Sequence, residues 1–541
     1  MLAASPNSLD IGIVCGYFAL TLLIGYLTRR NPGNSTQYLN ASRAMPLWIA
    51  ALSFLAVNLS GMEIVGLSAM SAEYGVTTLH FFWIGAIPAM LFLALFMIPI
   101  YLKSRARSVP EFLHLRFNSE TRLLNSISML IISALLSGIC LYAMASTLQC
   151  FLGWSFLFSA LMGGLLTSIF LVLGGLRATI YNELLQLAII LAGLAPLAFL
   201  ILADSHGIHG LVSSLPQDKS HLWTGMPLVS REAPMDGFGV AMGLGFVLSF
   251  GYWCTDFRLI QRALTTKDRQ EMRMVPLIAA AGKLMVPLLV IVPGLAAYRL
   301  FASHGIDAVT RNAVTYNYDQ ALPEMLRRYY GHGLLGLGIE AILAGLISGL
   351  AGNVAAFSSL WTEEIYRPYL ASAKTERHYI FVGRLSMMAG IAASIATAFI
   401  ALRFRNLMDY IQLLFSLFNA PLLAAFLLGM FTRWATPWGG FWGLLAGISV
   451  GAVHNMAVRA HLLSYGSQMS ANFYGAIYAW SVTMVAIAAI SAFTEGKDNL
   501  QLRGLVCEFK ALCGGSRATR AVLALALLLA AACAILNFWF R

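Results

Sequence analysis

Ionisable side chains are scarce inside the long apolar stretches of this sequence, so each one is a candidate for binding or ion transfer. Glu63 lies in the middle of one stretch, and Lys283 lies deep in another. A charge within hydrocarbon is costly, and such residues usually face a partner or a polar cavity. Lys283 could extend its ammonium group to the membrane surface, but it lies too far from the span end to be only an interfacial residue. We therefore expect a functional role or a buried ion pair, with Glu63 as one candidate partner.

Two apolar stretches are interrupted by small and polar residues, at 56–64 and at 248–256. These interruptions lie five predicted spans apart. Because five is odd, two consecutive five-helix units must have opposite orientations in the membrane. Broken helices at matching positions of two inverted halves are typical of transporter binding sites, where free carbonyls hold a cation. Close helix packing through Gly and Ser is the alternative, but packing does not require the carboxylate of Glu63.

Two further polar positions lie within predicted spans. Glu183 and Gln186 share one helical face near the inner end of the sixth span, where Glu183 could instead pair with Arg177. Gln412 is a buried amide that needs hydrogen-bond partners. These residues are candidates for the same binding site and ion path.

The composition indicates a chain that lies largely in a bilayer. Of the 541 residues, 59% are hydrophobic and 11% are charged, whereas soluble domains carry about 25% charged residues. Each helical crossing needs about 20 apolar residues, so the apolar runs predict an all-α polytopic membrane protein with about 14 transmembrane helices. The strands of a membrane barrel are shorter and alternate in polarity, which these continuous runs exclude.

The predicted spans form a single transmembrane transporter domain over 1–541. We expect a peripheral first span at 9–28, a first repeat at 46–203, an inverted second repeat at 236–430 and peripheral C-terminal spans at 434–540. Most of the 35 Lys and Arg residues lie in alternate loops, which places those loops inside and both termini outside. The net charge of +11 is then an orientation signal and does not indicate nucleic-acid binding.

The sequence contains no motif for nucleotide or metal chemistry. Its seven cysteines and ten histidines have no metal-ligand spacing, and it has neither a P-loop nor a dinucleotide-binding turn. We therefore expect an ion gradient, rather than enzyme chemistry, to supply the energy. A sodium ion prefers oxygen ligands, which Ser348 and the backbone oxygens of Ala56 and Leu59 could supply. The small residues around Ser348 could equally serve helix packing.

At these residues the sequence resembles the sodium/solute symporter family, and within it the sodium/glucose cotransporter branch. The resemblance runs from about residue 9 to 457. Its most specific segments, in chain order, are Tyr252-Trp253-Cys254-Thr255-Asp256, Ile260-Gln261-Arg262-Ala263-Leu264, Lys283-Leu284, Val292-Pro293-Gly294, Tyr410-Ile411-Gln412, Phe426-Leu427-Leu428-Gly429 and Phe441-Trp442-Gly443-Leu444. Weaker matches are Ser108-Val109-Pro110-Glu111-Phe112-Leu113, Gly174-Gly175-Leu176 and Ile365-Tyr366-Arg367-Pro368.

The resemblance implies a five-plus-five inverted repeat, alternating access and a sodium site between the second and ninth spans. The matching sodium ligands would be backbone oxygens of Ala56, Leu59 and Gly345, with the side chains at positions 348 and 349. Family members usually carry two adjacent hydroxyls at this last pair, whereas this chain has Ser348-Gly349. A water could replace the missing hydroxyl, or the site could be weakened and a proton carried instead by Glu63 or Glu183.

For the ion path, the resemblance matches Glu183 with an acidic position on the inner sodium route. For the solute, it matches seven substrate-binding positions: Asn58, Glu63, Ser249, Tyr252, Trp253, Lys283 and Gln412. Glu63 replaces an expected Gln, Ser249 an Asn found in some relatives, and the sugar-binding Glu of the third span falls on Trp83. A neighbouring position at which the sugar transporters carry a small hydroxyl residue is Ala86 in this chain. A sugar or polyol is the first choice, and another small polar solute is the alternative.

The expected function is secondary active symport, in which the sodium gradient drives uptake of a small polar solute across the plasma or inner membrane. A proton-coupled or sodium-independent transporter of another solute is one alternative. A sensor that binds a solute without transporting it is another, and the lost hydroxyl favours it, whereas the sequence shows no signalling domain. An ion channel has little support because no filter segment is apparent. The expected partners are the solute, sodium and the lipid bilayer.

Overall fold

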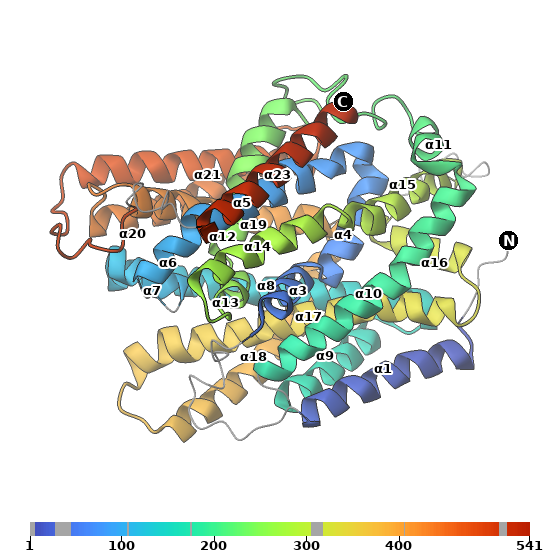
Figure 1. Ribbon diagram of the computed structural model, residues 1–541, viewed down its shortest axis with the longest axis horizontal. Helices are drawn as coiled ribbons and strands as arrows, with labels where there is room; N and C mark the ends of the chain where they lie inside the picture. The colour runs from blue at the N-terminus through green and yellow to red at the C-terminus, as the bar shows by residue number, and fades with distance from the viewer. Residues whose placement is uncertain are drawn as a thin grey trace.

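The computed structural model describes residues 6–27, 45–104, 106, 108–173, 176–304, 317–404, 406–507 and 517–541. Within these ranges every regular element is helical (Figure 1), which confirms the predicted all-α class. Among the described residues, ten helices are long and apolar enough to cross a membrane, or up to eleven if a bent pair is counted as one span. Three shorter apolar helices lie at other predicted spans. The total of about 14 spans and the inverted repeat stay predictions.

Two helices in the N-terminal part of the chain begin at polar capping residues. The side chain of Ser108 accepts a hydrogen bond from the Glu111 amide, and that of Asn118 accepts one from the Thr121 amide, which satisfies donors that the first helical turn leaves free. The elements of this part are α1 (Ser8–Leu27), α3 (Leu47–Asn58), α4 (Gly61–Tyr74), η1 (Gly75–Leu79), η2 (Phe81–Ala86), α5 (Ile87–Phe92), η3 (Leu93–Met97), α6 (Ile98–Ser104), α7 (Val109–Arg116), α8 (Ser119–Leu152), α9 (Phe156–Leu173), α10 (Leu176–Asp204) and α11 (Gly207–Ser213).

The C-terminal part contains the two candidate spans with the largest buried share among the described residues, Leu334–Leu370 and Leu407–Phe431. Its elements are η4 (Gly239–Leu248), α12 (Ser249–Thr255), α13 (Phe257–Ala263), α14 (Arg269–Lys283), α15 (Val286–His304), η5 (Tyr318–Gln320), α16 (Ala321–Tyr329), α17 (Leu334–Ser359), η6 (Leu360–Leu370), α18 (Glu376–Ala401), α19 (Leu407–Phe431), α20 (Pro437–Arg459), α21 (Gln468–Ser491) and α23 (Arg517–Trp539).

The second span is broken where the sequence predicted an interruption. Helix α3 ends at Asn58, α4 begins at Gly61, and the chain bends by 52° between them. The Ser60 amide donates to the carbonyl of Asn58 at 2.6 Å instead of to that of Ala56, as a continuous helix would require. The Ala56 carbonyl is therefore released from the helical ladder at this break.

The seventh span differs from the second. Its helix begins as the π-helix η4 and continues through Ser249–Thr255 as α12. It stops only at the end of the predicted interruption, where the Asp256 side chain accepts the amides of Arg258 and Leu259 and starts α13. Short π-helical insertions often occur at functional sites. The polar stretch is thus largely helical, and its break lies at Asp256.

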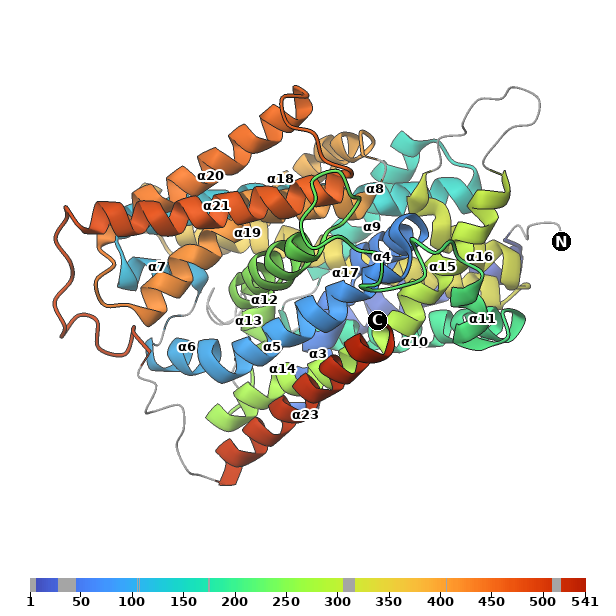
Figure 2. The ribbon, with the colours of Figure 1, turned by 90° about the horizontal axis from the view of Figure 1, so that it is seen from above.

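Helices α17 and α19 form the core of the molecule. In the spans Leu334–Leu370 and Leu407–Phe431, 83% of the most apolar window is buried, against 28% for Pro437–Arg459 and 22% for Thr519–Trp539. Figure 2 shows α20 and α21 on one side of the molecule and α23 alongside α14 and α5, and these helices are in contact. Helix α1 packs against α9, α10 and α17. The two most buried helices, α17 and α19, both contact α4, which follows the break. Helices α20 and α23 lie towards the surface.

Two glycines bring the broken helix close to α17. A Cβ atom added at Gly345 would lie 2.7 Å from the Gly61 nitrogen, and one added at Gly61 would lie 2.3 Å from Cγ of Leu346. Any larger residue at either position would push the two backbones apart. The start of α4 is thus held against the middle of α17, which positions the site described next.

Candidate functional site

Three polar side chains meet at the break of the second span. Nζ of Lys283, the last residue of α14, lies 2.5 Å from Oε1 of Glu63 in the first turn of α4. The same ammonium group donates to Oδ1 of Asn58. The Lys283 side chain is completely buried, so it does not extend to the membrane surface. The predicted ion pair between Lys283 and Glu63 is confirmed.

Within the described part of the chain, only one of the two carboxylate oxygens of Glu63 has a hydrogen-bond partner. Its Oε1 accepts from Lys283, whereas the buried Oε2 has no hydrogen-bond partner there. A buried charged oxygen without a partner carries a large desolvation cost. The site can therefore accept one more hydrogen-bond donor at this position.

Aromatic rings enclose the ammonium group of Lys283. Its Nζ lies 5.3 Å from the ring centre of Trp253 and 5.4 Å from that of Phe82, within the range of cation–π attraction. The hydroxyl of Tyr252 accepts from Nδ2 of Asn58 at 3.2 Å, and its ring stacks on Phe415 at 4.9 Å. Five of the seven predicted substrate residues thus lie in one cluster: Asn58, Glu63, Tyr252, Trp253 and Lys283.

Ser249 and Gln412 contact other residues. Ser249 packs against η2, where a Cβ atom added at Gly85 would lie 2.4 Å from its hydroxyl. The Gln412 amide nitrogen lies 3.7 Å from the sulfur of Met408, and its buried Oε1 has no partner among the described residues. No hydrogen bond recorded for the described part of the chain joins either residue to Lys283. Gln412 therefore presents an unsatisfied acceptor in the core.

Two of the positions at which the chain departs from the sugar-reading pattern lie on η2. Trp83 and Ala86 are both buried. The Trp83 ring lies 5.4 Å from that of Phe540, and its indole nitrogen has no partner within the described ranges. A bulky, largely apolar side chain therefore stands where the resemblance expects a carboxylate.

The predicted sodium ligands lie where α17 faces the break. Ala56, Leu59 and Gly345 are buried, and Ser348 is partly exposed. A Cβ atom at Gly349 would lie 2.9 Å from Sγ of Cys140 and 3.8 Å from the hydroxyl oxygen of Ser60. The hydroxyl of Ser60, which the sequence analysis did not select, thus lies beside the position of the missing ligand. Its place in the interruption at 56–64 was the signal available.

Glu183 forms a closed contact between three helices. Its Oε1 lies 2.6 Å from Nη2 of Arg262 on α13, and its Oε2 accepts from the Ser53 hydroxyl of α3 at 2.5 Å. All three side chains are buried. The alternative partner Arg177 has a side chain that lies outside the described residues. Arg262 belongs to one of the segments that carry the family resemblance, but the sequence did not identify it as the partner of Glu183.

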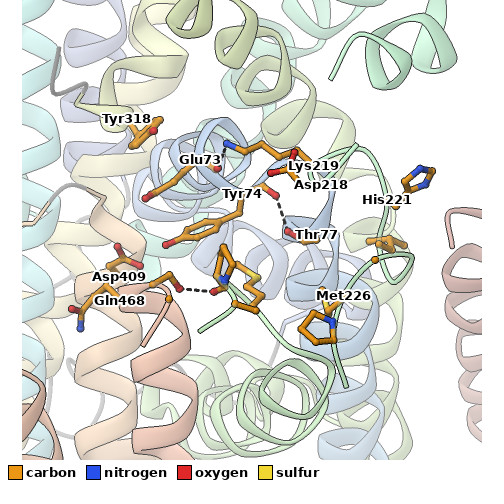
Figure 3. A pocket seen from close by; sticks show the side chains of 18 of the residues that line it. Glu73, Tyr74, Thr77, Asp218, Lys219, His221, Met226, Tyr318, Asp409 and Gln468 are labelled. Atoms are coloured by element: carbon orange, nitrogen blue, oxygen red, sulfur yellow. Dashed lines mark hydrogen bonds between the residues drawn. The ribbon is translucent and has the colours of Figure 1, made fainter. Parts of the chain in front are cut away.

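A cavity of about 1270 Å³ opens at the C-terminal end of α4 (Figure 3). Glu73, Tyr74 and Asp409 line it, and Oδ1 of Asp409 is buried without a partner in the described ranges. Lys219, from the loop after α11, donates to the Glu73 carbonyl at 2.8 Å. These acidic residues could not be identified from the sequence because they lie at the ends of predicted spans, where charges are usually solvated.

Known proteins resemble this chain over most of its length. The model of the sodium:solute symporter family matches residues 38–447. Sodium/glucose cotransporter 1 of Ovis aries is 28% identical, with 90% of this chain and 79% of that protein covered. The sodium/glucose cotransporter of Vibrio parahaemolyticus is 26% identical over 91% of each.

A solved structure has the same fold. It is the substrate-bound outward-open state of a Na⁺-coupled sialic acid symporter, which covers 91% of this chain and 99% of its own with a TM-score of 0.77 at 20% identity. The matched family consists of multi-pass, sodium-coupled transporters and not of enzymes. The match over most of its length shows that the chain belongs to the sodium:solute symporter family.

Proposed function

We propose that this protein is a secondary active symporter that uses the sodium gradient to drive uptake of a small polar solute by alternating access. The observation that carries the proposal is the Lys283–Glu63–Asn58 cluster at the break of the second span. Ion and solute groups at a helix break near mid-membrane are typical of such transporters. The proposed location is a plasma or inner membrane, with both termini outside.

The proposed solute is a sugar or other polyol that binds beside Lys283. A solute hydroxyl can donate to the unpaired Oε2 of Glu63, and a second can replace Asn58 as an acceptor from the ammonium group. A site with unsatisfied polar atoms favours the ligand that satisfies them. Tyr252 and Trp253 would close one side of the bound ring, and Gln412 would supply a further acceptor.

The proposed sodium site uses the carbonyls of Ala56, Leu59 and Gly345 with the hydroxyl of Ser348. Release of the Ala56 carbonyl at the break supports this assignment. Gly349 brings no ligand, and a side chain there would meet Cys140. We assign the missing oxygen to Ser60, whose hydroxyl lies beside that position. A sodium ion needs several oxygens and tolerates irregular geometry better than magnesium.

The proposed inner gate is the contact of Glu183 with Arg262 and Ser53. A sodium ion leaving the break towards the cytoplasm would meet this carboxylate, which the guanidinium neutralises in the closed arrangement. Separation of α13 from α10 would expose Glu183 to the ion. The proposed moving unit contains the second, third, seventh and eighth spans, within repeats at 46–203 and 236–430.

Uptake into proteoliposomes tests this function directly. The full-length protein is reconstituted, and uptake of a panel of radiolabelled hexoses and polyols is measured with an inward sodium gradient, with choline in place of sodium, and with a pH gradient alone. Sodium-driven uptake of at least one sugar or polyol is the expected result. Uptake driven only by the pH gradient would instead establish proton coupling, and saturable binding without uptake would establish a sensor. Either result would refute sodium symport.

A further inference from the structure

A second group of buried polar side chains lies between α1, α10 and α17, away from the Lys283 cluster. Its members are Tyr17 and Thr21 on α1, Gln186 on α10 and Glu340 on α17. All four are at least 95% buried, and Glu340 is completely so. Helix α1 packs against both α10 and α17, and α10 packs against α17.

Close backbone contacts hold these three helices together around Glu340. A Cβ atom added at Gly336 would lie 2.6 Å from Cα of Asp10 on α1, and one added at Gly193 of α10 would lie 2.6 Å from Cβ of Ala341. Because Gly336 and Ala341 flank Glu340 along α17, both neighbouring helices approach this carboxyl group. Little space remains for the side chain to turn towards solvent.

The carboxyl group of Glu340 has no counter-charge in the described part of the chain. Neither of its oxygens has a hydrogen-bond partner there, and the hydroxyls of Tyr17 and Thr21 are also without one. An ionised carboxylate in this setting is strongly disfavoured. The group must therefore bind a proton, or it must bind a cation that the neighbouring oxygens help to hold.

The charged and titratable groups on the surrounding helices are engaged elsewhere. On α1, Asp10 accepts from the amides of Gly333 and Gly336 at 2.7 and 2.8 Å. On α10, Glu183 is paired with Arg262. Tyr17 is a further buried titratable side chain on α1. None of these groups supplies a positive charge to Glu340.

We propose that Glu340, Tyr17, Thr21 and Gln186 form a second monovalent-cation site, occupied by a proton on Glu340 or by a sodium ion. This site is distinct from the one proposed at the helix break. Glu340 precedes Gly345 by five residues, which is about 7.5 Å along the axis of α17. This chain, which lacks a hydroxyl at position 349, thus carries a carboxyl group nearer the N-terminus of the same helix.

Two measurements on the purified full-length protein test the site and separate the two cations. Saturation binding of radioactive sodium should give two ions per wild-type chain and one per Glu340→Gln chain, a twofold fall, if sodium occupies the site. If a proton occupies it, both proteins should bind equal sodium. The wild type should then show an infrared carboxyl band that disappears as the pH is raised, and Glu340→Gln should lack this band.

Equal sodium binding together with no pH-dependent band from Glu340 would overturn the proposal. Glu364→Gln is the matched control, because Glu364 is paired with Arg122 at 2.7 Å and accepts from Ser108; its sodium count and infrared band should equal those of the wild type. If Glu340→Gln fails to fold, Tyr17→Phe keeps the ring and removes one oxygen. It should weaken binding of the same cation several-fold, and unchanged affinity would contradict the site.

The test also separates this proposal from the symport function. Ser348→Ala should remove the sodium ion at the helix break and leave the Glu340 site intact. If Ser348→Ala leaves sodium binding unchanged, the assignment at the break is wrong whatever Glu340 binds. If Glu340→Gln alone leaves both measurements unchanged, the second site is wrong and the first stands.

Discussion

At the scale of single residues, the buried pair of Lys283 and Glu63 dominates the centre of the protein. Two opposite charges at 2.5 Å satisfy one another only in part, since Oε2 of Glu63 stays without a partner. A fully satisfied pair would resist an incoming solute, whereas an incomplete one can bind it. The same atoms therefore contribute to stability and to the proposed solute recognition.

Removing one partner of this pair should cost both stability and binding. Lys283→Ala leaves the Glu63 carboxylate buried and alone, so we expect a loss of about 3–5 kcal/mol in the free energy of unfolding. Solute affinity should fall at least tenfold. Gln412→Ala should weaken affinity with a smaller effect on stability. Thermal unfolding and equilibrium binding measure the two effects, and unchanged affinity in both variants would show that the solute site lies elsewhere.

The Ser60 hydroxyl should affect sodium affinity and not solute recognition. Ser60→Ala removes the oxygen that lies beside position 349, so the apparent sodium constant should rise several-fold while the solute constant at saturating sodium stays near that of the wild type. Adding Gly349→Ser to the Ser60→Ala variant should not compensate for the lost hydroxyl, because the new Cβ would lie 2.9 Å from Sγ of Cys140. Adding Gly349→Ser and Cys140→Ala together to the Ser60→Ala variant should restore sodium affinity. Sodium activation curves of uptake would reveal a failure of either pattern.

Asp319 should give the unfolding transition a distinct pH dependence. It lies outside the spans, and burial raises the pKa of its carboxyl group from 3.8 to about 7, although the Leu407 amide donates to it at 2.9 Å. The native state then binds the extra proton between these values, so this group lowers stability as the pH rises from about 4 to about 7. Asp319→Asn should flatten that slope in Tm measurements, and an unaltered slope would exclude Asp319 as its cause.

At the scale of elements, the sequence predicted the break of the second span and the pair that lies there. It could do so because Asn58, Ser60, Gly61 and Glu63 have no reason to occur together in a uniformly apolar helix. The seventh span was harder to read. Small and polar residues in it continue as helix to Thr255, and the Thr255 hydroxyl donates to the Gly251 carbonyl of the same helix.

The partner of Glu183 could not be identified from the sequence. Arg262 is 79 residues away and is brought near only because α13 packs on α3 and α10 packs on the same helix. The nearest basic residue in the chain was the natural candidate. The place of Asp409 in a cavity could not be predicted for a related reason. The other lining residues, such as Glu73 and Lys219, come from distant parts of the chain and meet it only after folding. Long-range partners depend on packing that local periodicity does not encode.

The contact between α10 and α13 should control access from the inner side. Arg262→Ala breaks the ion pair and leaves Glu183 with Ser53 alone, so the inner end of α3 should become more accessible. A cysteine placed at Ser53 should react several-fold faster with a membrane-impermeant thiol reagent applied from the inside when Arg262 is also replaced. Arg258→Ala is the matched control, since Arg258 pairs with Asp256 at 3.1 Å. Equal rates in the Arg262 variant and its parent would contradict an inner gate there.

At the scale of the whole molecule, the positive charges of the loops predict the orientation in the membrane. The predicted arrangement places the loop that contains Lys219, and with it the large cavity, on the outer face. Single cysteines at Asp218 and at Lys267 in a cysteine-free background should react with an impermeant reagent on opposite sides of oriented vesicles, with Asp218→Cys modified from outside. Labelling of both from the same side would overturn the orientation.

The continuity of helix α17 affects both of the proposed cation sites on it. It is one continuous helix of 26 residues, so Glu340 and the Gly345–Gly349 segment cannot move independently. A cation that favours one tilt of α17 must also alter the affinity at the other site, and this coupling is reciprocal. We therefore expect occupancy of the two sites to be cooperative, and any residue that changes the pose of this helix to alter the steepness of sodium activation.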